Sequence, residues 1–143
     1  LVEIEPSADP TLLHPDFKSQ PVFAFLKKYN NIKIVKPRYE DYMGSGWSWN
    51  DFGEGYMAQR SNLPLYGNVV VITKKPDNSI RLLPAGSFKT ILTQPLKNGF
   101  TVQKNWDENV FSFSDGTDKS KDVPFRPDLR RAQPHAGPAQ AAQ

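Results

Sequence analysis

The sequence predicts an α+β fold, with a small, mainly antiparallel sheet, one or two helices and a long aromatic loop. Three observations carry this prediction. Thirteen prolines and nine glycines in 143 residues imply short elements joined by many turns. Several runs alternate in polarity or are rich in β-branched residues, as strands are. Only one segment, residues 22–29, carries a broad apolar face with helical spacing.

The first third of the chain predicts a strand, a helix and a second strand. Val2 and Ile4 alternate with glutamates, which indicates a strand with one buried face. After a turn cluster at residues 6–11, Ser19 is expected to cap a helix that has Pro21 in its first turn and ends near residues 30–31. Strand character returns at residues 32–35, and a long aromatic loop is expected from about Pro37 to Gly67.

The remaining strands are predicted as two antiparallel pairs. Residues 68–73 form the most strongly β-branched run, and turn residues 76–79 join them to residues 80–83 in a hairpin. A second pair, residues 100–104 and 110–113, surrounds an Asn-Trp-Asp segment at 105–107. A turn at Asp115-Gly116 is expected to end the last strand.

These patterns divide the chain into three parts. Residues 1–98 are expected to form an α+β domain that contains the aromatic loop, and residues 99–128 the start of a second small β unit. Residues 129–143 are rich in alanine, glutamine and proline and have almost nothing to bury, so they are expected to be a flexible or foreign tail.

Composition argues against several classes of function. The net charge is only +3 and the basic residues are scattered, so nucleic-acid binding is not expected. Cysteine is absent, which excludes disulfides and thiolate chemistry. No apolar run reaches the ~20 residues of a membrane span. His14 and His135 are far apart, so neither a metal site nor a Ser-His pair is expected.

The segment Gly44–Asp51, Gly-Ser-Gly-Trp-Ser-Trp-Asn-Asp, is the strongest candidate for a binding site. At extended spacing, Trp47 and Trp49 would point to one side and Ser48 and Asn50 to the other. Asp51 adds a negative charge beside this aromatic area. Such a surface suits a ligand with an apolar stem and a cationic head. The alternative interpretation is a structural turn with two core tryptophans.

Four segments, taken in order, resemble one family, the class C penicillin-binding proteins, which are serine D-alanyl-D-alanine carboxypeptidases and endopeptidases. The strand and turn Leu-Val-Glu-Ile…Ser-Ala-Asp-Pro-Thr-Leu at residues 1–12 is similar to that family's opening strand and turn. The helix and strand at 22–35 follow in the same order. Gly-Trp-Ser-Trp-Asn-Asp at 46–51 resembles its Trp motif, and the aromatic and asparagine pattern at 56–68 resembles the approach to its next strand.

The resemblance implies an accessory region that overhangs the active-site cleft, inserted between the first two catalytic motifs. It also implies that Asp51, with Trp47, Trp49 and Asn50, contacts the peptide stem of peptidoglycan, the acid meeting the amine of a diamino-acid side chain. The expected location is periplasmic or otherwise extracytoplasmic. The expected partners are the peptide stem and the remainder of a catalytic domain or a partner chain. No cofactor is implied.

The family's catalytic residues are absent from this sequence. No serine is followed three residues later by lysine, and Lys89-Thr90 is followed by isoleucine rather than glycine. We therefore expect no catalytic residue in this chain. Two alternatives remain open beside the accessory region: a non-catalytic binding or interaction subunit derived from that fold, and an unrelated β-rich domain that shares short motifs by chance.

Overall fold

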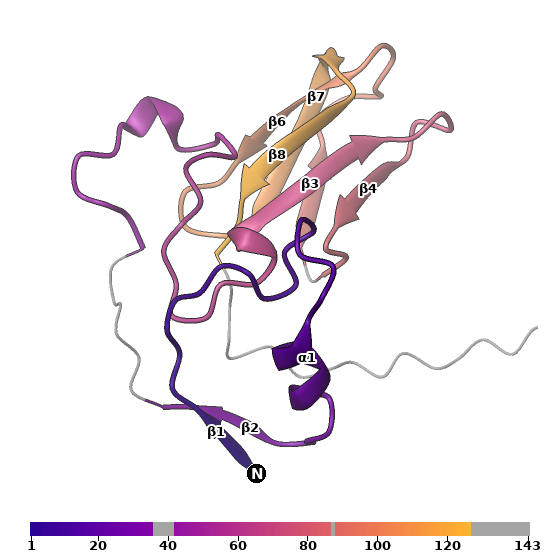
Figure 1. Cartoon of the computed structure of the whole chain (residues 1–143). Helices are drawn as coiled ribbons and strands as arrows, with labels where there is room; N and C mark the ends of the chain where they lie inside the picture. Colours follow the sequence, from indigo (N-terminus) through magenta and orange to yellow (C-terminus); the bar gives the residue numbers. More distant parts are fainter. Residues whose placement is uncertain (36–41, 87, 127–143) are drawn as a thin grey trace, which may run out of the picture.

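A computed structural model describes residues 1–35, 42–86 and 88–126 (Figure 1). The predicted tail at 129–143 lies outside the described residues. The elements, in chain order, are β1 (Val2–Ile4), α1 (Pro21–Leu26), β2 (Ile32–Ile34), the 3₁₀ turns η1 (Trp49–Asp51) and η2 (Tyr66–Asn68), β3 (Val69–Lys74), β4 (Ile80–Leu83), β5 (Lys89–Leu92), β6 (Phe100–Lys104), β7 (Val110–Asp118) and β8 (Ser120–Pro124).

The strands form three small sheets, which confirms the predicted α+β class with mainly antiparallel pairing. β1 and β2 pair in parallel, with α1 as the crossover between them. The second sheet has the order β4-β3-β8, with both pairs antiparallel, and the third has the order β5-β7-β6. Within the third sheet, β6 pairs antiparallel and β5 parallel with β7. Figure 1 shows β1 and β2 at the opposite end of the molecule from the other strands.

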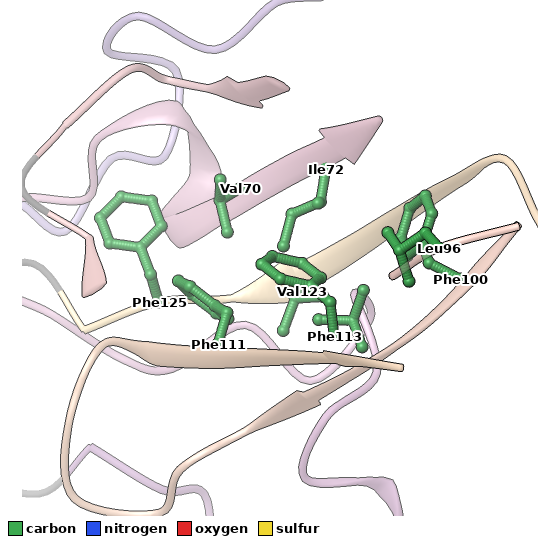
Figure 2. Packing of buried hydrophobic residues seen from close by; sticks show 9 residues of the cluster. Val70, Ile72, Leu96, Phe100, Phe111, Phe113, Val123 and Phe125 are labelled. Carbon is green, nitrogen blue, oxygen red and sulfur yellow. The ribbon is translucent and has the colours of Figure 1, made fainter. Parts of the chain in front are cut away.

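The main hydrophobic core lies between the two three-stranded sheets. Alternate side chains of β3, β6 and β7 point inward, as the period of a strand requires. Figure 2 shows them meeting from both sheets, with phenylalanines of β7 facing β3 and β8. The cluster consists of Val70, Ile72, Leu96, Phe100, Val102, Phe111, Phe113, Val123 and Phe125. The segments on either side of the predicted 98/99 boundary therefore share one core: β5 belongs to the third sheet, and β8 returns to pair with β3.

The predicted hairpin at residues 68–83 is confirmed as β3 and β4. The carboxylate of Asp77 accepts hydrogen bonds from the backbone N–H (2.9 Å) and the hydroxyl (2.6 Å) of Ser79. These hydrogen bonds lower the pKa of Asp77. Asn78 takes a left-handed backbone conformation, with φ of 65°. The local turn chemistry of the sequence was therefore sufficient to identify this hairpin.

The predicted turn at Asp115-Gly116 is wrong. β7 continues through these residues to Asp118, with an irregularity in register opposite Phe100 and Thr101. A Cβ atom on Gly116 would lie 2.9 Å from the carbonyl carbon of Phe100, so the glycine allows two backbones to approach at a bulge. The Asp115 carboxylate accepts the N–H groups of the loop before β6, at 3.1 and 3.2 Å, which lowers its pKa.

The helix is shorter than predicted and begins differently. Its N-cap is Gln20 rather than Ser19. The Gln20 amide donates hydrogen bonds to the carbonyls of Thr11 (3.0 Å) and Phe17 (2.9 Å), so this side chain holds the preceding turn instead of capping the helix. None of the residues of α1 is buried, and Phe25 is 46% exposed. No helix in the described ranges has the length and apolar character that a membrane span requires.

Asn68 connects the aromatic loop to the sheets. Its side chain is buried and donates hydrogen bonds to the Gln59 carbonyl (2.7 Å) and the Ser61 hydroxyl (2.8 Å). Its own carbonyl accepts the N–H of Phe125 at 2.8 Å, and its Oδ1 accepts the N–H of Leu65 at 3.2 Å. The residue has φ of 58°, a conformation that asparagine tolerates better than most residues.

We expect Asn68→Ala to lower the free energy of unfolding by about 2–4 kcal/mol, because buried partners lose their hydrogen bonds and alanine disfavours positive φ. Asn68→Gly, which removes the backbone strain, should recover only about 1 kcal/mol. The exposed Asn78→Ala, at φ of 65°, is the control for backbone strain alone. Urea denaturation measures all three variants. Equal losses for Asn68→Ala and Asn78→Ala would show that the buried hydrogen bonds add nothing.

Candidate functional site

The four predicted site residues lie on one loop, which we call the Trp loop and define as residues 42–60. Hydrogen bonding closes its base, where the N–H of Arg60 donates to the carbonyl of Tyr42 at 2.8 Å. Figure 1 shows η1, near the tip of this loop, standing away from the strands. Near the C-terminal end of the loop, Met57 and Gln59 are buried, which fixes this part of the loop against the rest of the molecule. The loop therefore has a fixed base and an exposed tip.

The Trp motif does not take the extended conformation in which its two tryptophans would point to one side. Residues Trp49–Asp51 form a 3₁₀ turn, so the two tryptophans do not alternate as they would on a strand. The hydroxyl of Ser48 accepts the N–H of Asn50 at 3.2 Å, and its carbonyl accepts the N–H of Asp51 at 3.2 Å. A serine in this position offers the backbone an alternative to strand pairing, which explains the turn.

Trp47 is half-buried and packs within the loop. Its indole covers Gly44, where a Cβ atom would lie 2.3 Å from the indole Nε1. Only glycine leaves room for the ring at that position. Gly46 has φ of 78°, so the second glycine of the motif is needed for its backbone angle. Trp47 thus matches the structural interpretation of the motif more closely than the ligand-binding one.

Trp49, by contrast, is 72% exposed and stacks on an aromatic residue from another part of the chain. Its ring centroid lies 4.1 Å from that of Trp106, which is in the loop between β6 and β7, and the ring planes are inclined by 31°. Phe52 lies 4.2 Å from Trp106, inclined by 42°. We call these three rings the aromatic stack. It brings together the Trp loop and the third sheet, and the sequence had given Trp106 no role in the site.

Asp51 and Asn50 share the η1 turn with Trp49. Asn50 is exposed, and Asp51 is half-exposed. The pKa of Tyr56 is raised above 10.0, first by partial desolvation and then by a hydrogen bond to Asp51 and the charges of Asp51 and Glu54. Tyr56 itself is 73% exposed. The structure therefore places a carboxylate, a phenol and an indole together at the accessible tip of the loop.

The other acid of the loop, Glu54, is used to hold the loop on β8. Its carboxylate lies 3.2 Å from the Nζ atom of Lys121. The next residue, Gly55, packs against Asp122 so closely that a Cβ atom would lie 2.7 Å from the aspartate Cβ. Glu54 is thus committed to an ion pair in the folded protein, whereas Asp51 has its carboxylate near a neutral hydroxyl.

Two cations lie under the aromatic residues. The Nζ atom of Lys104 is 4.5 Å from the ring centroid of Phe52, and the Cζ atom of Arg126 is 4.1 Å from that of Tyr42. Burial, reinforced by the Arg126 charge and opposed by Asp107, lowers the pKa of Lys104 to about 8. Cation–π contacts contribute about 0.5–2 kcal/mol each, and of these two only the contact of Lys104 with Phe52 involves the aromatic stack.

A hollow of about 200 Å³ lies at the base of the Trp loop, beside the buried Asn68. None of the four predicted site residues lines it. Gln59 lines this hollow, and its buried Oε1 atom has no hydrogen-bond partner among the described residues. Among the described residues, no group of three or more histidine and acidic side chains is arranged to hold a metal ion.

The structure thus brings three of the four predicted residues, Trp49, Asn50 and Asp51, into one exposed turn and leaves Trp47 packed on Gly44. The residues that the sequence did not identify are Trp106, Tyr56 and Lys104. A large aromatic residue in a hairpin loop was the only signal for Trp106. Neither a scan against protein-family models nor a search of curated proteins finds a match for this chain.

The stability of the protein is expected to rise between pH 8 and 10.5, through Lys104. Its amine has a pKa of about 8 in the folded chain and an ordinary value of 10.5. Across this interval the unfolded chain binds the extra proton, so the free energy of unfolding increases with pH. Lys104→Met should remove this part of the pH dependence, and Lys89→Met, at an exposed position on β5, should retain it. Urea denaturation at pH 7 and 10 measures the effect. Identical pH profiles for wild type and Lys104→Met would contradict it.

Proposed function

We propose that this chain is the accessory, substrate-reading region of a serine D-Ala-D-Ala carboxypeptidase or endopeptidase that acts on the peptide stems of peptidoglycan outside the cytoplasm. The observation that carries the proposal is the half-exposed carboxylate of Asp51, which shares an exposed turn with the largely exposed indole of Trp49. The reacting serine belongs to a part of the enzyme outside this sequence, and this region reads the substrate without taking part in bond cleavage.

The chemistry of the turn fits a side chain with an alkyl stem and a terminal ammonium. A carboxylate binds an ammonium group by a charge-assisted hydrogen bond, which is about twice as strong as a neutral one. The indole face of Trp49 can cover the alkyl stem and adds a cation–π contribution. Because Glu54 is paired with Lys121, Asp51 is the acid of this loop that is available to such a ligand.

The rigidity of the loop supports a reading role. The turn is anchored on one side by the aromatic stack and on the other by the backbone hydrogen bond between Arg60 and Tyr42. A carboxylate on such a support loses little conformational entropy when it binds a ligand. It can therefore discriminate more strongly between a cationic and a neutral ligand.

A second function, a non-catalytic binding subunit that retains this loop, is the alternative, because the absence of a Ser-x-x-Lys pair is common to both functions. A labelled β-lactam separates the two functions when it is added to the full-length gene product. Covalent labelling of a serine supports the enzyme, because a β-lactam acylates the nucleophile of such enzymes. If the full-length product is complete at 143 residues, folds and never labels, the result supports the binding subunit.

Asp51→Asn tests the proposed role of the carboxylate. We expect the wild-type chain to bind a stem peptide with a free diamino-acid amine in preference to the same peptide with that amine acetylated. The variant should lose this preference by at least about tenfold, since charged hydrogen bonds contribute about 1.5–3 kcal/mol. Isothermal titration calorimetry on the two peptides measures it.

Asp107→Asn is the matched control, because this acid lies in the same region but is exposed on the loop beside Trp106. It should keep the preference of the wild type for the free amine. If wild type and Asp51→Asn bind the free and the acetylated peptide equally well, the proposed role of Asp51 is wrong.

A further inference from the structure

We infer that the exposed face of Trp49, supported by Trp106, is a saccharide-binding platform that takes a sugar ring of a glycan strand. The inference rests on the proposed function in one respect, since a glycan strand carries the peptide stems that the loop is proposed to read. It adds a second ligand class at the same loop, a neutral carbohydrate in addition to a cationic peptide. Its evidence is the geometry of the aromatic stack.

The first argument is the exposure of the indole. Trp49 is 72% exposed, and its one ring contact among the described residues is with Trp106 at a centroid distance of 4.1 Å. One face of the indole is therefore covered and the opposite face is open. Together with the half-exposed Phe52 and Trp106, which are in ring contact, the open indole forms a contiguous aromatic surface, and contiguous exposed apolar surface often marks a ligand site.

The second argument is that other aromatic residues support the covered face of the Trp49 indole and fix its position. Trp106 contacts Trp49 on one side and lies 4.2 Å from Phe52, which in turn has the ammonium group of Lys104 4.5 Å from its ring. A pyranose ring presents a patch of C–H groups with partial positive charge, and the face of an aromatic ring carries partial negative charge. A fixed indole is thus complementary to the flat face of a sugar.

The third argument is the polar composition around the two indoles. Trp49 is followed by Asn50 and Asp51, and Trp106 is flanked by Asn105 and Asp107. Two segments that are distant in the sequence, each with one tryptophan, one asparagine and one aspartate, are therefore joined by the ring contact. Amides and carboxylates are the groups that donate to and accept from sugar hydroxyls.

Charge favours a neutral sugar over the bases of a nucleic acid, which also stack on exposed indoles. Asp51, Asp107 and Glu108 are close in sequence to the stacked rings, and acidic groups repel a phosphate backbone. The two nearby cations, Lys104 and Arg126, are positioned over Phe52 and Tyr42. A saccharide without phosphate avoids this repulsion.

The test is a titration of the 143-residue chain with a β-1,4-linked trisaccharide of N-acetylglucosamine, followed by tryptophan fluorescence and by the NMR signals of the indole N–H groups. We expect saturable binding that perturbs the signals of Trp49 and Trp106 and leaves Trp47 unchanged. Trp49→Ala should weaken binding by at least about tenfold, and Trp49→Phe, which keeps a smaller ring, by less. Because Trp49 is largely exposed, both variants are expected to fold.

Leu92→Ala is the control variant, because Leu92 is 59% exposed on β5 and belongs to neither the Trp loop nor the stack. It should bind the trisaccharide like the wild type. Unaltered binding by Trp49→Ala, the absence of any binding by the wild type, or tighter binding of an oligothymidylate than of the trisaccharide would each overturn the inference. The two proposals fail separately, because the trisaccharide carries no amine. Equal binding of the free and the acetylated stem peptide would overturn the peptide proposal alone, and absence of trisaccharide binding would overturn this inference alone.

Discussion

The contact of Trp106 with both Trp49 and Phe52 is the interaction on which the rest of the site depends. It joins a loop that has no strand of its own to the hairpin of β6 and β7. Ring pairs of this kind contribute about 0.5–1.5 kcal/mol each beyond their buried area. The partly exposed ion pair between Glu54 and Lys121 contributes at most about 1 kcal/mol. The aromatic stack is therefore the main attachment of the loop tip, and it sets where Trp49 and Asp51 stand.

The base of the loop is attached by a different kind of interaction, a set of buried hydrogen bonds centred on Asn68. Its side-chain amide donates to the carbonyl of Gln59 and the hydroxyl of Ser61, and its backbone carbonyl accepts the N–H of Phe125, which follows β8. Leaving such buried groups unpaired costs more than the net gain from each bond, so the base is specified mainly by the penalty for breaking it. Aromatic contacts at the tip and polar contacts at the base together hold the loop in one position.

Local patterns in the sequence identified the elements that local chemistry determines. The hairpin of β3 and β4 was predictable because a β-branched strand leads into Pro-Asp-Asn-Ser, where Asp77 accepts a hydrogen bond from Ser79 within the turn. The bulge at Gly116 was not predictable, because the dipeptide Asp-Gly occurs both in turns that end a strand and inside strands where another backbone approaches closely. β5 and β8 were missed: β5 is exposed throughout, and neither strand shows a clear alternation. The contact of Trp49 with Trp106 joins distant segments, which no spacing rule reveals.

The candidate site thus depends partly on the local sequence motif and partly on a contact between segments that are distant in the sequence. Asn50 and Asp51 follow from the motif, whereas the open indole face depends on a partner supplied by another hairpin. The most direct measurement of this account is amide hydrogen exchange on Trp106→Ala. We predict faster exchange across residues 47–57 and unchanged protection of Phe111 and Phe113 in β7. Unchanged exchange in the loop, or equal acceleration in the loop and in β7, would contradict the central claim that this ring holds the loop in place.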